Sequence, residues 1–150
     1  MGIISSASGA SCWKGLDYYK SKKIKNIKKL NDMEYTSIVS GTEKYNVYLN
    51  LKNPRKSTCN CPLANGKRII CKHIVATYFS VVPDSAKEFE DEQTRLQEEY
   101  EEYQKNEYKN AIKFINKMSK KELIEEPVYI FNYAPEWVYD DFIKRNDIKG

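Results

Sequence analysis

Long apolar runs are absent from this sequence of 150 residues. The longest, from Ile74 to Val82, is about half of the roughly 18 residues that a membrane-spanning helix requires, and Thr77 and Ser80 interrupt it. The first residues also lack a charged segment followed by an apolar core, which is the pattern of a secretion signal. We therefore expect a cytoplasmic protein without a membrane partner, in which metal binding by cysteine is favoured over disulfides.

Histidine is nearly absent, since the chain has only His73, and no Gly-x-x-x-x-Gly-Lys-Ser/Thr loop is present to hold nucleotide phosphates. No Ser/His/Asp, Cys/His or paired-carboxylate arrangement stands out either, because most acidic residues fall in a predicted solvated helix. We therefore expect no enzymatic activity and no small-molecule substrate. An enzyme would need a second, open metal site that the sequence does not show.

Arginine is scarce, with 4 residues against 21 lysines, and the net charge of +4 conceals an asymmetry. Residues 1–82 contain 14 Lys and Arg against 4 Asp and Glu, a net charge of +10, whereas residues 83–150 contain 11 against 17, a net charge of −6. A basic half is typical of a chain that binds a polyanion. Because arginine is the usual reader of base edges, we expect binding driven by phosphates, sensitive to salt and weakly sequence-specific.

The spacing of apolar residues in the first half predicts a small α+β domain. A short helix can begin at Ser8 or Ser11, because serine caps free backbone N–H groups, and it should end near Lys22. Alternation of apolar and polar residues then predicts three antiparallel strands, and a fourth leads into the first cysteines. The four strand segments are residues 23–30, 33–41, 44–52 and 55–60.

From Cys71 onward the sequence predicts helices. The segment CKHIVATYFSVV predicts a helix that Pro83 stops, and Ser85 with Glu88 forms a capping-box pattern that opens a helix of about 30 residues. Ser119 with Glu122 opens a shorter helix, followed by a turn and a last helix after Pro135. We therefore divide the chain into a basic domain, residues 1–82, and an acidic helical region, residues 83–150.

Three of the four cysteines and the histidine lie within fifteen residues, as Cys59-x-Cys61 and Cys71-x-His73. Two cysteines separated by one residue share a face of a strand, and Cys71 can precede a helix whose first turn holds His73. Three thiolates and one imidazole fill the four positions of tetrahedral zinc, so we expect one structural Zn(II) ion. The alternative is that these are ordinary buried residues. Cys12 lies outside the motif and is expected to pack in the first helix.

This pattern, with Pro62 after the second cysteine and CKHIVA at its end, resembles the SWIM zinc finger. The segments WKGLDYYKSKKIKNI and YTSIVSGTEKYNVYLNL resemble the regions that precede this finger in bacterial SWIM proteins, so the resemblance covers residues 8–82. It implies a ββα finger and a module that binds DNA or proteins, because SWIM fingers occur in helicase-type ATPases, transposases, recombination accessory proteins and ubiquitin ligases. It implies as metal ligands Cys59, Cys61, Cys71 and His73.

Lysines interleaved with aromatic residues give the first half candidate contacts to nucleic acid. Lysines can track phosphates while Tyr18 or Tyr19 stacks on a base, although the same pattern fits a solvated basic face with core tyrosines. We expect a non-catalytic module that binds nucleic acid, and DNA first, through a basic, zinc-stapled face. The candidate contacts are Lys14, Lys20, Lys22, Lys23, Arg55, Lys56, Lys67, Arg68 and Lys72.

The second half leaves an alternative open. The apolar stripe of its long helix could pair with another helix, making a homodimer or docking on a larger protein machine, or it could pack on its own zinc domain. In the first case the chain is a protein-interaction adaptor or inhibitor. The acidic region could also fold over the basic face and mask it, since the two halves carry opposite charge.

Overall fold

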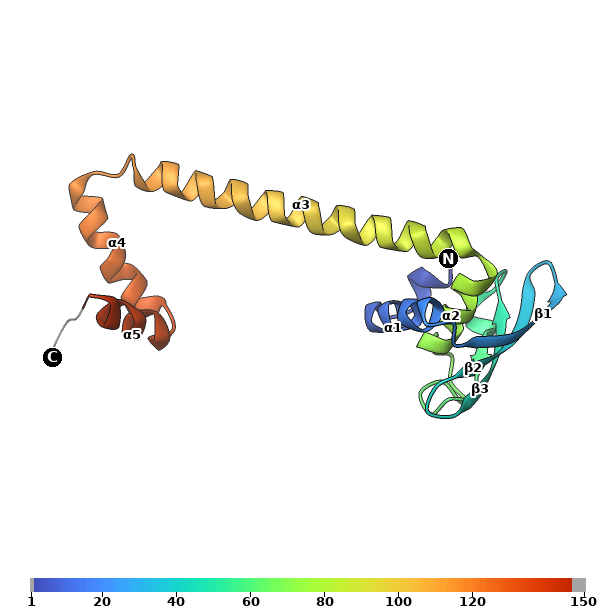
Figure 1. The fold of residues 1–150 in the computed structure, drawn as a ribbon. Helices are drawn as coiled ribbons and strands as arrows, with labels where there is room; N and C mark the ends of the chain where they lie inside the picture. Colours follow the sequence, from blue (N-terminus) through green and yellow to red (C-terminus); the bar gives the residue numbers. More distant parts are fainter. Residues whose placement is uncertain (1, 147–150) are drawn as a thin grey trace. The chain divides into compact units, whose positions relative to one another are not determined.

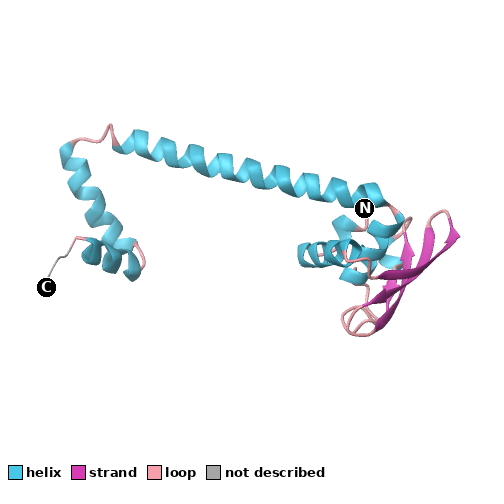
Figure 2. Cartoon of the chain, in the orientation of Figure 1, coloured by secondary structure: helices cyan, strands magenta, loops and turns pink. Residues whose placement is uncertain are grey.

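The structure is a computed structural model that describes residues 2–146, and it has an α+β fold with 59% helix and 18% strand. The chain forms two compact units, Met1–Thr94 and Arg95–Gly150. Residues 2–146 form five α-helices and one four-stranded antiparallel sheet, as the sequence predicts (Figures 1 and 2). The helices are α1 (Gly9–Lys20), α2 (Lys72–Val81), α3 (Pro83–Ile115), α4 (Lys120–Tyr133) and α5 (Glu136–Arg145).

Helix α1 begins where serine capping predicts. Ser8 is its N-cap, and the Ser8 side chain accepts a hydrogen bond from the backbone N–H of Ser11 at 3.2 Å. One face of the helix is buried through Cys12 and Leu16, whereas Trp13 remains 48% exposed. The serine cap therefore fixes the start of the helix, and Leu16 anchors it to the core.

The sheet has the order β1-β2-β3-β4 with antiparallel neighbours, which confirms the predicted meander. The register of β1 shifts between Lys25 and Lys28, where Asn26 has a positive φ of 50°. Asparagine tolerates this left-handed conformation better than most residues, so it can host the irregularity. The strands are β1 (Ile24–Asn31), β2 (Glu34–Ser40), β3 (Lys44–Asn50) and β4 (Thr58–Cys59).

The fourth strand is shorter than predicted. Pro54 opens a 3-10 turn, Pro54–Lys56, and the backbone N–H of Ser57 donates to the Pro54 carbonyl at 2.9 Å. We expected a strand over residues 55–60, but the turn includes the first two of these residues. Only Thr58 and Cys59 pair with β3. The prediction of a strand from Arg55 was wrong because proline favours the turn conformation.

The core of the first unit lies between the sheet and helices α1 and α2, which cover one face of the sheet (Figure 2). Side chains of β2 and β3 that face the helices are buried, whereas those on the other face are more exposed. A hydrogen bond of 2.7 Å between the hydroxyls of Ser37 and Thr77 ties β2 to α2 inside this core. The fully buried side chains include Leu16, Val39, Leu49, Ile74, Val75 and Phe79.

Helix α3 begins at Pro83 and not at Ser85, so the predicted capping box is wrong. Proline suits the first helical position, because its missing N–H would have no partner there. The Ser85 hydroxyl donates to the Val82 carbonyl at 2.6 Å instead of capping the helix. The first turns of α3 pack within the first unit: the Phe89 ring contacts the Trp13 ring at 5.2 Å, and Glu90 forms an ion pair with Lys20.

The second unit contains the rest of α3 with α4 and α5. The predicted capping box at Ser119 and Glu122 is present. We expected a turn from Pro127 onward, but helix α4 continues through this residue. Phe131, which lies beyond the proline, packs on Tyr139 and Phe142 of α5 and so anchors the end of the helix. No helix in residues 2–146 is both long and apolar enough to cross a membrane.

Candidate metal centre and basic groove

Two chain segments bring the four predicted ligands together. Cys59 ends β4, and after Cys61 the chain turns sharply, since the backbone N–H groups of Ala64 and Asn65 both donate to the Cys61 carbonyl. Gly66 completes this turn with a positive φ of 68°, as the Asn-Gly pair predicts. The chain then returns to helix α2, where Cys71 is the N-cap and His73 lies in the first turn.

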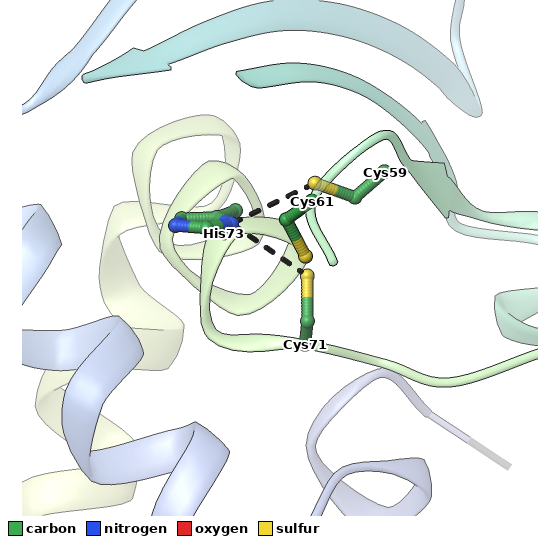
Figure 3. A group of neighbouring side chains, drawn as sticks. All are labelled: Cys59, Cys61, Cys71 and His73. Carbon is green, nitrogen blue, oxygen red and sulfur yellow. Dashed lines mark hydrogen bonds between the residues drawn. The ribbon is translucent and has the colours of Figure 1, made fainter. Parts of the chain in front are cut away.

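The four ligand atoms lie within 4.8 Å of one another, and all four residues are buried. Figure 3 shows the side chains pointing toward one another, with Cys59 at the end of β4, Cys61 in the loop after it, and Cys71 and His73 at the start of α2. The Nδ1 atom of His73 is 3.6 Å from the Cys59 sulfur and 3.9 Å from the Cys71 sulfur.

These separations fit zinc. A tetrahedral ion with bonds of about 2.3 Å to sulfur and about 2.0 Å to nitrogen holds its sulfur and nitrogen ligands roughly 3.5 Å apart. Three thiolates and one imidazole are also the donor set of closed structural sites. The cluster of Cys59, Cys61, Cys71 and His73 is therefore compatible with one structural zinc ion. This ion would cross-link β4 and the loop that follows it, residues 60–70, to α2; we call this loop the finger loop.

The cluster favours negative charge before any metal is considered. A hydrogen bond from the Cys59 thiol lowers the pKa of Cys71, against the opposing effect of burial. The same contact, together with burial, raises the pKa of Cys59. The His73 ring and the backbone N–H groups at the start of α2 also lower the pKa of Cys71. A divalent cation would stabilise the thiolate form of these sulfurs.

Aromatic rings hold the His73 imidazole in place. Tyr45 stacks on it with ring centroids 4.5 Å apart, and Tyr18 approaches edge-on at 5.4 Å. The Thr77 hydroxyl donates to the His73 carbonyl at 2.9 Å, which fixes its backbone. The Nδ1 atom faces the sulfurs, whereas the buried Nε2 atom has no hydrogen-bond partner among the described residues. In this orientation Nδ1 is the ring nitrogen that would bind a metal ion held by the three sulfurs.

Cys12 lies outside the cluster, as predicted. Its side chain is buried in α1, and its thiol is 3.8 Å from the Ile4 carbonyl. Burial raises the pKa of Cys12, so this thiol is disfavoured as a thiolate. It therefore acts as a small packing residue in the first helix.

Seven of the nine predicted nucleic-acid contacts fall into two groups, and the first, Lys14, Lys23 and Lys72, lies beside the metal centre. Lys23 and Lys72 hold their ammonium groups 4.4 Å and 4.7 Å from the centre of the Tyr18 ring. A cavity of about 390 Å³ next to the cluster is lined by Lys14, Tyr18, Tyr45 and Lys72, among others. Lys22 occupies the turn after α1 with a positive φ of 51°, and Lys20 is engaged with Glu90.

The second group forms what we call the basic groove, which is lined by Arg55, Lys56, Lys67 and Arg68. The groove has a volume of about 510 Å³ and lies between the turn at Pro54 and the finger loop. Its other lining residues are Tyr48, Ser57, Thr58, Ala64 and Gly66, so no carboxylate lines it. Two pairs of cations that are separated in the sequence thus converge on one hollow of the surface.

Sequence reasoning missed one residue of this groove, Tyr48. It lines both the basic groove and a larger hollow on the outer face of the sheet. The signal was present in the alternation of β3, which places Asn46 and Tyr48 on the face opposite Val47 and Leu49. A tyrosine on the outward face of a strand does not serve the core and merits attention as a contact residue.

Comparison with known proteins supports the metal centre. Residues 45–81 match the family model described as SWIM zinc finger, which spans β3, the four-residue cluster and α2. The match does not extend to the upstream residues that we expected to share the resemblance. No curated protein and no solved structure gives a significant match to the chain. The chain therefore contains a SWIM zinc finger over residues 45–81, built around the cluster of Cys59, Cys61, Cys71 and His73.

Proposed function

We propose that the chain is a non-catalytic module that binds nucleic acid through its basic groove, with DNA as the first candidate. One observation carries this proposal: Arg55 and Lys56 converge with Lys67 and Arg68 on a hollow that no carboxylate lines. Like charges repel, so a fold that gathers four cations without acidic partners in one hollow is suited to a polyanion.

The charges of the groove are largely unneutralised within the protein. Among the residues described, Arg55, Lys67 and Arg68 form no ion pair. Lys56 has a carboxylate nearby, since its charge contributes to lowering the pKa of Glu34 after the larger effects of Tyr48 and Asn31. Phosphate groups would supply the missing negative charge, and release of their counterions would drive binding.

The zinc finger gives the groove its shape. Lys67 and Arg68 belong to the loop between the two halves of the metal cluster, so their position depends on the cross-link between Cys61 and Cys71. Arg55 and Lys56 lie directly before Cys59 on the other side of the groove. A structural metal ion would thus hold the two cationic pairs at a fixed separation, which reduces the entropy lost on binding.

Fluorescence anisotropy of labelled DNA and RNA with the zinc-loaded full chain tests the proposal. We expect binding that falls log-linearly with salt, and the double variant Arg55→Glu/Arg68→Glu should weaken it at least about tenfold near physiological salt. Each lost phosphate contact should reduce the slope of log affinity against log salt by roughly 0.7 to 0.9. The absence of binding even at low salt would overturn the proposal.

The matched control is Lys44→Glu/Lys52→Glu. It changes the net charge of the same unit by the same amount, at exposed lysines that do not line the groove. We expect this control to weaken binding far less than the groove variant. An equal loss in both variants would show that binding depends on overall charge, and would rule out the groove as the site.

A second candidate function is protein docking through the second unit, and a specific observation favours it. Many large apolar side chains of this unit are exposed, including Tyr103 at 63%, Phe114 at 67% and Trp137 at 68%. Exposed apolar groups of this size often mark protein contacts. A homodimer or a complex with a larger protein would cover them, and sedimentation of the full chain across a concentration series distinguishes a self-associating chain from a monomer.

A further inference from the structure

The outer face of the sheet, opposite helices α1 and α2, carries a hollow of about 630 Å³, which Cys59 of the metal cluster also lines. Strands β1, β2 and β3 form its floor, and the finger loop borders it through Asn65 and Gly66. Its polar lining is amide-rich and hydroxyl-rich and contains one cation, Lys28. The lining side chains that matter here are Asn26, Thr36, Asn46, Tyr48, Thr58, Asn60 and Asn65.

This hollow is continuous with the basic groove. Both are lined by Tyr48, Thr58 and Gly66, so one opens directly into the other. The basic groove in turn shares Arg55 and Arg68 with a further hollow of about 430 Å³. A single extended path thus runs from an amide-rich floor with one lysine to a strip of cations, and no carboxylate lines any part of it.

Tyr48 stands at the junction of this path, and its hydroxyl is held by neighbours. Its oxygen accepts a hydrogen bond from the Asn50 side chain at 3.1 Å, and it also bonds to the Glu34 carboxylate. Its partners across the sheet are small: Thr36 on β2 and Thr58 on β4. Within the described residues no aromatic ring or cation covers the Tyr48 ring, so a fixed aromatic face is available for stacking.

The amides of the floor are also available. The side chains of Asn26, Asn46 and Asn65 make no hydrogen bond to any other residue that the structure describes. Only Asn60 is engaged, through its Oδ1 atom, which accepts from the backbone N–H of Asn46 at 2.8 Å. An asparagine amide offers two donors and one acceptor oxygen, the complement of the edge of a nucleobase.

We propose that this path binds one single strand of DNA or RNA, an inference that rests on the proposed nucleic-acid function. The bases lie on the outer sheet face, stacked on Tyr48 and within reach of the asparagine amides, and the phosphates follow the basic groove. A duplex fits these features less well, because its bases are stacked and paired and cannot present their faces to a tyrosine. The four cations of the basic groove complement the regularly spaced phosphates of a nucleic-acid strand, so we favour nucleic acid over a peptide as the occupant.

The test compares Tyr48→Leu with Tyr48→Phe in the zinc-loaded full chain, by anisotropy of a labelled single strand and of its duplex. We expect the wild type to bind the single strand more tightly than the duplex at equal salt. Tyr48→Leu should weaken single-strand binding about tenfold, because it loses the stacking ring. Tyr48→Phe keeps the ring and should bind within about twofold of wild type.

A second variant keeps the proposal testable if Tyr48→Leu does not fold. Asn46→Ala/Asn65→Ala changes two exposed side chains that make no hydrogen bonds to described residues, so it should keep the fold. We expect it to weaken single-strand binding by at least about fivefold, the lower end of what the loss of two hydrogen bonds predicts.

The outcomes separate this inference from the function on which it rests. If Tyr48→Leu and the asparagine variant bind the single strand like wild type while Arg55→Glu/Arg68→Glu does not, the strand path is wrong and the basic groove stands. Tighter binding of duplex than of single strand also overturns the path. If the wild type binds neither form, both proposals fall together.

Discussion

The Tyr45 ring stacks on the imidazole of His73, with ring centroids 4.5 Å apart and ring planes 22° from parallel. Tyr45 is itself fixed, since its hydroxyl is 2.8 Å from that of Thr42, and the ring is buried against the core. A metal ligand that cannot rotate binds its ion with a smaller entropic cost. The sheet thus positions the one nitrogen ligand of the candidate zinc site.

This contact predicts that Tyr45→Leu weakens zinc retention. An aromatic pair contributes about 1 kcal/mol beyond the area it buries, so the apparent zinc affinity should fall roughly fivefold. Competition with a chromophoric chelator measures this change. Tyr45→Phe keeps the stack and should retain the wild-type affinity, whereas equal losses in both variants would point to the Thr42 hydrogen bond.

Removing the metal should unfold the first unit. The ion would cross-link the finger loop to α2, and structural zinc commonly contributes about 10 kcal/mol or more of apparent binding free energy. We expect Cys71→Ser to lose the bound zinc, measured by elemental analysis, together with the near-ultraviolet circular dichroism of the folded state. Cys12→Ala is the matched control: a cysteine outside the cluster is removed, so one zinc ion per chain should remain.

The contact between α1 and α2 at Gly15 predicts a specific sensitivity to a methyl group. A Cβ atom at Gly15 would lie 2.6 Å from Cγ1 of Val75 and 3.0 Å from the Lys72 carbonyl oxygen. Gly15→Ala should therefore lower the free energy of unfolding by about 1 to 3 kcal/mol, measured by urea denaturation of the zinc-loaded protein.

Two further variants interpret the Gly15 result. At Gly9 in the same helix nothing lies within 4 Å of an added Cβ, so Gly9→Ala should change stability by less than about 0.5 kcal/mol or increase it. Gly15→Ala/Val75→Ala frees space for the added methyl. If the double variant loses as much free energy of unfolding as the two single variants lose together, the steric explanation is wrong.

The metal ligands and most elements could be predicted because their signals are local. Two close pairs of ligands with a turn between them identify the cluster, and Ser8 and Ser119 mark helix starts by their own hydrogen bonds. Where two local signals competed, prediction was wrong: Pro83 overrode the pattern at Ser85, and Pro54 shortened the fourth strand. Each proline fixes its own backbone, which a capping pattern or an alternation cannot override.

The four cations of the basic groove were among the predicted contacts, but their convergence on one hollow could not be predicted, because it depends on tertiary structure. Arg55 and Arg68 are distant in sequence, and only the turn at Pro54 and the finger loop bring them to one hollow. The proposed role of Tyr48 could not be predicted without knowing which face of the sheet the helices cover. Charge counting identified the half of the chain that contains the groove, and its candidate contacts include Lys20, which the structure pairs with Glu90.

The capping box of α4 predicts a pH dependence for the second unit. The Ser119 hydroxyl accepts from the Glu122 backbone N–H at 3.3 Å, and the Glu122 carboxylate accepts from the Ser119 backbone N–H at 2.7 Å. Hydrogen bonds from Ser119 lower the pKa of Glu122 below its ordinary value of 4.5. Because the folded pKa lies below the unfolded one, the carboxylate stabilises α4 above pH 4.5, and this stabilisation is lost as pH falls through the folded pKa.

Ser119→Ala should therefore raise the pKa of Glu122 toward its ordinary value, since it removes the larger of the two interactions that lower it. Titration of the Glu122 carboxyl carbon by NMR measures this shift directly. Glu122→Gln retains an oxygen that accepts from the Ser119 N–H but does not titrate, so the acid-dependent loss of α4 helicity assigned to this carboxylate should vanish. An unchanged pKa of Glu122 in Ser119→Ala would mean that the capping box does not persist in solution, and that α4 depends on its packing against α5 instead.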